Sequence, residues 1–150
     1  MNELIHKVTT WADEGNLIGG SDSKTQTLKL ISEAGKLSRT IANRKDCRND
    51  VGNCFVVIIV LAAMDEYNIG EFIARSDLSK IDDDHDAISS FMYELWEEFG
   101  VLSDAVNKGN PYRSILDDLL IILSGIAKFY NYSLEECLEI ACHQIKELNE

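Results

Sequence analysis

The sequence predicts an all-α helical bundle, and three observations support this prediction. The chain of 150 residues contains a single proline, Pro111, and proline interrupts helices because it lacks a backbone N–H donor. No stretch alternates apolar and polar residues for long enough to predict a strand. Apolar residues instead recur at helical spacing, as in the first segment, where Leu4, Val8 and Trp11 share one face. We therefore expect one all-α domain over residues 1–150.

Seven helices are expected from this periodicity and from residues typical of helix ends. The expected ranges are 2–14, 23–43, 49–66, 69–76, 86–108, 112–130 and 134–148. Three of the starts carry residues that can cap a helix, namely Ser23 with Gln26, Asn68 with Glu71, and Ser133 with Glu136. The third helix is apolar nearly all round, so we expect it to lie at the centre of the bundle.

Charge and composition exclude several classes of protein. The formal net charge of −12 gives a surface that repels nucleic acid phosphates, so we expect no direct nucleic acid binding. The most apolar run, residues 54–64, spans 11 residues and is too short to cross a bilayer. No secretion signal is recognisable at the start, and the four cysteines lack CxxC spacing. We expect a cytoplasmic protein without a membrane segment, with reduced and mostly buried cysteines.

The two halves of the chain resemble each other. A shift of 65 positions, without a gap, aligns residues 30–71 with residues 95–136. The identical pairs include Leu30/Leu95, Glu33/Glu98, Gly35/Gly100, Leu37/Leu102, Ser38/Ser103, Arg48/Arg113, Ala62/Ala127, Tyr67/Tyr132 and Glu71/Glu136. We interpret the pattern as a tandem duplication of a helical hairpin, with repeats at about 22–76 and 87–148 and an acidic linker at about 77–86.

The repeated glycine predicts a packing contact. A glycine in a helix interior costs roughly 1 kcal/mol relative to alanine. Both repeats nevertheless keep it, at Gly35 and Gly100. We therefore expect another helix of the bundle to pass close to each of these two positions.

Four segments that cover most of the chain carry a family resemblance: WADEGNLI, KLISEAGKL, DVGNCFVVIIVLA and YSLEECLEIACHQIK. A helix of the form EExxE with an inner glycine, followed by a helix with ExxD before an apolar run, resembles the MazG family. The last of the four segments is similar to phage and bacterial MazG-like proteins. The resemblance implies an all-α nucleoside triphosphate pyrophosphohydrolase that splits an NTP or dNTP into NMP and pyrophosphate with Mg²⁺.

The spacing of the motif suits this chemistry. Residues three apart share one face of a helix, so two such helices together present four carboxylates. Mg²⁺ prefers oxygen ligands and neutralises phosphates during attack by water. In the first repeat, SEAGK keeps Glu33 but has Lys36 where the last glutamate is expected, and DVGN keeps Asp50 but has Asn53.

The second repeat also departs from the motif. EEFGV keeps Glu97 and Glu98 but has Val101 at the third position. ILDD has Ile115 where a glutamate is expected, although Asp117 and Asp118 follow it. The candidate metal ligands are therefore Glu33, Asp50, Glu97, Glu98, Asp117 and Asp118. A composite site that joins Glu33, Asp50, Glu98 and Asp118 across the two halves is one arrangement to test.

Two further residues, Lys36 and Trp96, are candidates to contact a nucleotide. The Lys36 ammonium can alternatively neutralise Glu33 and Asp50 in place of a metal ion. Trp96 can line a nucleotide pocket, although a core position is the alternative for this side chain.

Three functions are compatible with the sequence. The first is a MazG-like pseudoenzyme with an eroded Mg²⁺ site that binds a nucleotide weakly or acts through a protein partner. The second is an active Mg²⁺-dependent NTP or dNTP pyrophosphohydrolase. The third is an acidic interaction or decoy protein. The tandem repeat indicates that one chain builds the bundle that single-repeat relatives would assemble as a dimer, and a further homodimer stays open.

Overall fold

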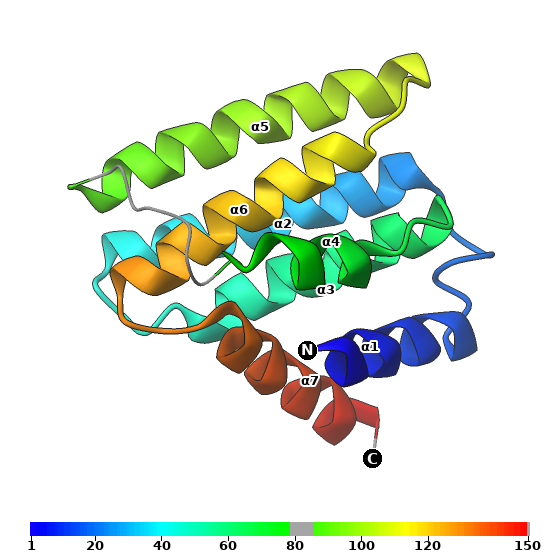
Figure 1. The fold of residues 1–150 in the computed structure, drawn as a ribbon, viewed down its shortest axis with the longest axis horizontal. Coiled ribbons are helices and arrows are strands. Elements are labelled where there is room, and N and C mark those ends of the chain that lie inside the picture. The colour runs from blue at the N-terminus through cyan, green and yellow to red at the C-terminus, as the bar shows by residue number, and fades with distance from the viewer. Residues whose placement is uncertain (79–85, 150) are drawn as a thin grey trace.

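The structure of the protein, a computed structural model, describes residues 1–78 and 86–149, with side chains up to Lys146. These residues form seven α-helices and no strand, so the all-α prediction is confirmed (Figure 1). Their bounds are α1 Asn2–Glu14, α2 Ser23–Ala42, α3 Arg48–Met64, α4 Ile69–Ser76, α5 Ile88–Lys108, α6 Arg113–Phe129 and α7 Leu134–Asn149. Most of the expected acidic linker, residues 79–85, lies outside the described residues.

Two helical hairpins form a four-helix bundle. Helix α2 packs on α3 and α5 packs on α6, while contacts of α2 with α5 and of α3 with α6 join the two hairpins (Figure 1). Helices α1 and α7 cover the remaining side of α3. Helix α3 is therefore central, as its composition predicts, and every residue from Cys54 to Ala62 is buried.

None of the described helices is long and apolar enough to cross a bilayer. All four cysteines are free thiols. Cys47, Cys54 and Cys137 are buried and Cys142 is partly buried, in agreement with the expected core positions.

Two of the three expected caps are present. The Asn68 side chain accepts a hydrogen bond from the Glu71 backbone N–H at 3.3 Å, and Ser133 Oγ accepts one from that of Glu136 at 3.1 Å. The Ser23 cap is wrong, because Asp22 caps α2 by accepting a hydrogen bond from the Thr25 N–H at 2.7 Å. An aspartate at this position also places negative charge at the positive end of the helix dipole.

The bounds of the helices follow the shift of 65 positions. Helices α2 and α5 begin at residues 23 and 88, α3 and α6 span 48–64 and 113–129, and α4 and α7 begin at 69 and 134. Left-handed backbone also recurs in pairs: Arg44 with Gly109, and Glu66 with Asn131. These observations support our interpretation of the chain as a tandem duplication.

Equivalent residues of the two repeats also make reciprocal contacts. The Arg48 guanidinium of the first repeat lies 4.8 Å from the ring centroid of Tyr132 in the second. The Arg113 guanidinium of the second lies 5.3 Å from the ring centroid of Tyr67 in the first. Each contact is a cation–π interaction of the kind that arginine makes with tyrosine. The two hairpins are therefore arranged with approximate two-fold symmetry.

The expected close approach at Gly35 and Gly100 is wrong. A Cβ atom built at either position has no heavy atom within 4 Å, because both positions lie on the outer faces of their helices. The close approach occurs instead at Gly52 of α3, where a Cβ atom would clash with the carbonyl oxygen of Cys137 and lie 2.8 Å from the Ala141 Cβ. Gly52 therefore lets α7 pack directly against α3.

This difference gives a matched pair of glycine substitutions. We expect Gly52→Ala to lower the free energy of unfolding by about 1–3 kcal/mol, because the added methyl group overpacks the contact between α3 and α7. Gly100→Ala should instead raise it by up to about 1 kcal/mol, because alanine has the higher helix propensity and meets open space. Urea unfolding followed by circular dichroism measures both. Equal destabilisation by the two variants would contradict this packing.

Candidate functional site

The first pair of acids lies between α2 and α3. Burial of Leu30, Ala34 and Leu37 fixes the face that α2 turns toward the core, and Glu33 lies at the edge of this face with its side chain 13 % exposed. Glu33 Oε1 accepts a hydrogen bond from Lys36 Nζ at 3.4 Å. Glu33 Oε2 is buried and, among the described residues, has no hydrogen-bond partner.

Asp50 lies in the first turn of α3. Both carboxylates act on the same thiol: the pKa of Cys54 is raised above its usual range by complete burial and, to a lesser extent, by the negative charges of Glu33 and Asp50. The two acids therefore flank one buried sulfur. The Asn49 Oδ1 atom, one residue before Asp50, is also buried without a partner among the described residues. The sequence analysis missed Asn49, although its position beside a motif acid was a usable signal.

Lys36 reaches only part of this pair. Its side chain is 60 % exposed, and its ion pair is with the outer oxygen of Glu33. Within the described part of the chain, Lys36 makes no ion pair with Asp50. The lysine thus neutralises one acid from the surface and leaves the inner oxygen of Glu33 unpaired.

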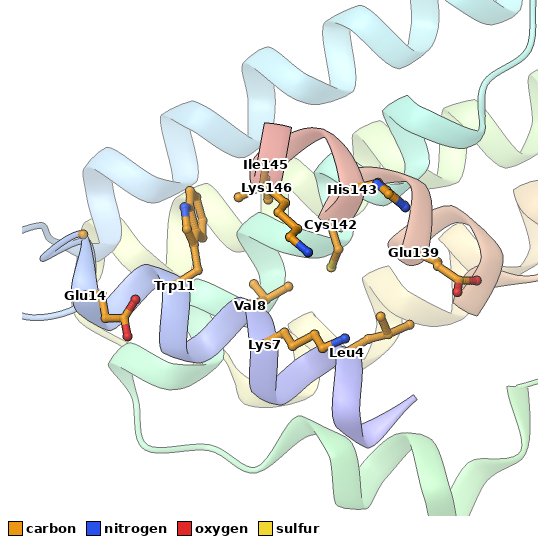
Figure 2. A pocket seen from close by; sticks show the side chains of 11 residues that line it. Leu4, Lys7, Val8, Trp11, Glu14, Glu139, Cys142, His143, Ile145 and Lys146 are labelled. Atoms are coloured by element: carbon orange, nitrogen blue, oxygen red, sulfur yellow. The ribbon is translucent and has the colours of Figure 1, made fainter. Parts of the chain in front are cut away.

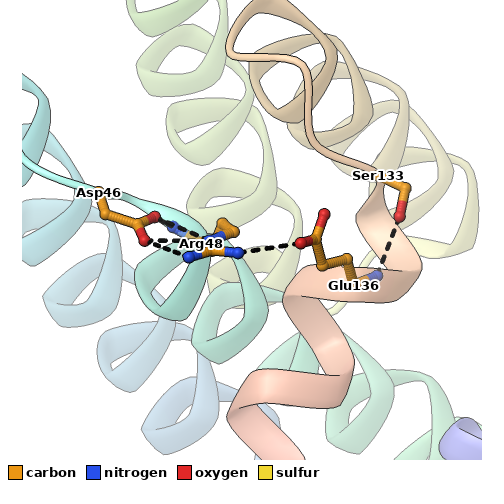
Figure 3. A network of polar contacts seen from close by, with 4 residues as sticks. All are labelled: Asp46, Arg48, Ser133 and Glu136. Carbon is orange, nitrogen blue, oxygen red and sulfur yellow. Dashed lines mark hydrogen bonds and ion pairs between the residues drawn. The ribbon is translucent and has the colours of Figure 1, made fainter.

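An arginine network holds the start of α3 in place (Figure 3). Arg48 donates to both carboxylate oxygens of Asp46, and its Nη1 donates to Glu136 Oε1 on α7 at 2.9 Å. The hydrogen bonds from Arg48 hold the pKa of Asp46 below its ordinary value of 3.8. Because Asp50 follows Arg48 by two residues, this network positions the first turn of α3 and its acid.

The second group of acids lies on α5 and α6. The pKa of Glu98 is raised above its ordinary value of 4.5, first by partial burial and then by the negative charges of Asp118, Glu97 and Glu94. Glu98 and Asp118 are therefore close enough to repel each other across the two helices. Glu98 is the counterpart of Glu33 in the aligned motifs. Asp118 holds the last position of ExxD, which is Asn53 in the first repeat, and Asp50 holds the first position, which is Ile115 in the second.

Asp117 accepts hydrogen bonds from a tyrosine outside the two motif helices of its repeat. The Tyr67 hydroxyl donates to both of its carboxylate oxygens, at 2.7 and 2.9 Å. Burial and the Asp118 charge raise the pKa of Asp117, and the hydrogen bond from Tyr67 opposes this rise. Desolvation and the hydrogen bond to Asp117 raise the pKa of Tyr67 to about 12. Asp117 thus binds the segment before α4.

Among the described residues, no three side chains of His, Cys, Asp or Glu are arranged to share a metal ion. The composite site of Glu33, Asp50, Glu98 and Asp118 stays a prediction. Val101, which is 46 % exposed, and Ile115, which packs against the core, offer no oxygen ligand at the motif positions.

Trp96 does not lie in the core, which was the alternative to a nucleotide pocket for this side chain. Its side chain is 40 % exposed, and its indole N–H donates to Ser38 Oγ on α2 at 3.1 Å. The indole also packs edge-on against Phe99, with ring centroids 5.5 Å apart. Trp96 therefore links α5 to α2 and keeps part of its ring open to solvent.

A separate groove of about 820 Å³ lies between α1 and α7 (Figure 2). Trp11 and Cys142 line it, together with the cationic side chains Lys7 and Lys146. Lys7 also lowers the pKa of Cys142, although burial raises it more. None of the acids predicted as metal ligands lines this groove.

The fold and these side chains define an all-α bundle with two pairs of acids on facing helices. No family model matches the chain, and no solved structure matches it. The chain is similar to an uncharacterized 18.2 kDa protein in the rep-hol intergenic region of Haemophilus phage HP1 (strain HP1c1), with 34 % identity over 64 residues. This match covers 41 % of the chain and 39 % of the phage protein, so the similarity extends over less than half of either protein.

The contact between Tyr67 and Asp117 can be tested by removing one hydroxyl. We expect Tyr67→Phe to lower the free energy of unfolding by about 1–3 kcal/mol, because Asp117 then lacks its donor in a half-buried position. Tyr93→Phe is the matched control, since Tyr93 is 76 % exposed. Urea titrations of both variants measure the difference. A loss as small as that of the control would show that the hydrogen bond does not stabilise the fold.

The raised pKa of Glu98 predicts a pH-dependent stability. The folded state holds the Glu98 proton up to a higher pH than the unfolded state does, so stability falls as the pH rises above 4.5 through the raised pKa. Glu98→Gln removes this loss. The variant should therefore become more stable than the wild type as the pH rises toward neutrality, with a smaller difference in acid. Thermal unfolding across this range measures the effect, with Glu14→Gln at an exposed position on α1 as the control.

Proposed function

We propose that this protein is a degenerate MazG-like protein that keeps the bundle of a nucleoside triphosphate pyrophosphohydrolase and has lost the metal-dependent reaction. It would bind a nucleotide weakly or act through a protein partner, in the cytoplasm of a bacterium or of a phage-infected cell. The all-α fold and the phage relative are compatible with this proposal. The assignment to the MazG-like family in this proposal rests on the resemblance of the two motif helices.

The ion pair between Lys36 and Glu33 is the observation that carries the proposal. A cation fixed in the chain occupies the motif position of a metal ligand and binds the remaining acid of its helix. In the second repeat, Asp117 is likewise bound by the Tyr67 hydroxyl. Acids that the chain neutralises with its own donors contribute less to binding a metal ion.

An active pyrophosphohydrolase is the second candidate, and one observation favours it. The inner oxygen of Glu33 is buried and unpaired beside Asp50, as a ligand awaiting a cation would be. Mg²⁺ commonly binds through one or two carboxylates, several waters and the phosphates of a substrate. Glu33 with Asp50, or Glu98 with Asp118, would then hold Mg²⁺ when a nucleotide supplies the other ligands. Mg²⁺ would supply charge neutralisation at the phosphates.

The chain also offers side chains for a nucleotide in either case. Lys36 is exposed and can pair with a phosphate, and the open part of the Trp96 ring can stack on a base. Trp96 contacts α2 at Ser38, about half a turn after Lys36. These two residues are our candidates for substrate binding.

An assay of pyrophosphate release distinguishes the degenerate protein from an active pyrophosphohydrolase. We expect no release of pyrophosphate when the purified protein is incubated with Mg²⁺ or Mn²⁺ and each common NTP and dNTP. Turnover that is abolished by Glu98→Gln or by Asp118→Asn would overturn the proposal and establish the hydrolase. Turnover that survives both substitutions but is abolished by Glu33→Gln or Asp50→Asn would also overturn the proposal and would place the reaction at the first pair of acids. Turnover that survives all four substitutions would come from a contaminating enzyme and should disappear on further purification.

The role of Lys36 can be tested by restoring the missing acid. Lys36→Glu rebuilds the last position of EExxE, so we expect it to strengthen Mg²⁺ binding by about tenfold, which is 1.4 kcal/mol. Lys29→Glu makes the same change of charge on the exposed side of the same helix and serves as the control. Isothermal titration calorimetry with MgCl₂ measures both variants. Equal effects of the two would show that Lys36 is an ordinary surface lysine.

A further inference from the structure

Exposed apolar side chains gather on two equivalent helices. Among the described residues, the large hydrophobic side chains that stay exposed are Leu28 at 68 %, Tyr93 at 76 %, Val101 at 46 % and Trp96 at 40 %. All of them belong to α2 or α5. Leu28 and Tyr93 occupy the same position in the two repeats, 65 residues apart. Exposed large apolar side chains on one face of a protein commonly mark a site of interaction with another protein.

The same two helices carry the two open glycines. No heavy atom lies within 4 Å of a Cβ built at Gly35 or at Gly100. Among the described residues, no other helix makes a close approach at either glycine. A helix from outside can therefore approach the backbone of α2 and α5 closely at both positions.

The outer faces of α2 and α5 carry opposite charges. Helix α2 has four basic residues and one acid, and that acid, Glu33, is mostly buried. Helix α5 has four acids and one basic residue, Lys108. The exposed charges are Lys24, Lys29, Lys36 and Arg39 on α2, against Glu94, Glu97, Asp104 and Lys108 on α5. Lys108 pairs with Asp104 at 3.1 Å, so α5 stays acidic mainly through Glu94 and Glu97. A protein with a net charge of −12 thus displays a basic helix beside an acidic one.

We propose that a second copy of this chain docks on this surface, with α2 of each copy against α5 of the other. Helices α2 and α5 lie side by side and run in opposite directions (Figure 1), and the hydrogen bond from Trp96 to Ser38 joins them. A two-fold rotation about an axis along the seam between them places each α2 over the partner's α5. Both contacts then form at once, and both are complementary in charge.

Charge also selects this arrangement over the alternative. A two-fold axis across the helices would place α2 on α2 and α5 on α5, with like charges facing each other. The apolar side chains and open glycines supply the centre of the contact in the preferred arrangement, and the charged residues supply its rim. The inference is independent of any nucleotide chemistry.

Sedimentation velocity of the full chain over a wide concentration range tests the proposal. We expect the wild type to dimerise reversibly. The double variant Lys29→Glu, Arg39→Glu should weaken the dimer at least tenfold, because acidic α2 then faces acidic α5. Glu97→Lys with Asp104→Lys should do the same through two basic faces. An equimolar mixture of the two double variants should restore a dimer, since every α2 again meets an α5 of opposite charge.

The control variant makes the same change of charge on a different surface of the protein. Lys7→Glu with Lys146→Glu alters the groove between α1 and α7 and should leave the dimer intact. A wild type that stays monomeric at every concentration would overturn the proposal. So would a dimer that only the groove variant weakens, because a different face would then be the interface. If a charge variant fails to fold by circular dichroism, Leu28→Ser with Tyr93→Ser tests the same face at two exposed positions.

Discussion

Burial of α3 on every side is the constraint from which the rest of the fold follows. An unbroken run of apolar side chains has no face to offer water, so neighbouring helices must cover its whole circumference. Helices α2 and α6 cover it from within the bundle, and α1 and α7 complete the shell. Gly52 makes this possible on one side, because α7 comes close enough to meet the backbone of α3. The polar chemistry of α3 is thereby restricted to its first turns, where Asn49 and Asp50 lie.

The sequence predicts the helices well because their signals are local. Apolar periodicity and the caps at Asn68 and Ser133 each depend on a few neighbouring residues, and the structure confirms them. The glycine prediction failed because a shared residue does not say which way it faces. Gly35 and Gly100 are shared but point outward, whereas the contact that needs a glycine is at Gly52, which has Asp117 as its counterpart.

The sequence predicts which acids are candidates for the site, but it does not predict how they are arranged in space. The motif located Glu33, Asp50, Glu98 and Asp118, and the raised pKa of Glu98 shows that this acid interacts electrostatically with Asp118. The distribution of the acids in space depends on helix rotation and on long-range partners. Tyr67, which is 50 residues from Asp117, could not be recognised as its donor from the sequence. The reach of Lys36 to a single oxygen of Glu33 is likewise a property of the folded side chains.

The reciprocal contacts of Arg48 with Tyr132 and of Arg113 with Tyr67 have a consequence for cooperativity. Each half of the chain provides the cation for an aromatic ring of the other half, so neither half is complete alone. Opening of one hairpin removes partners from both and exposes the apolar surface of α3 at the same time. The two repeats are therefore one cooperative unit, whose slowest-exchanging amides report global unfolding from both sides of the duplication.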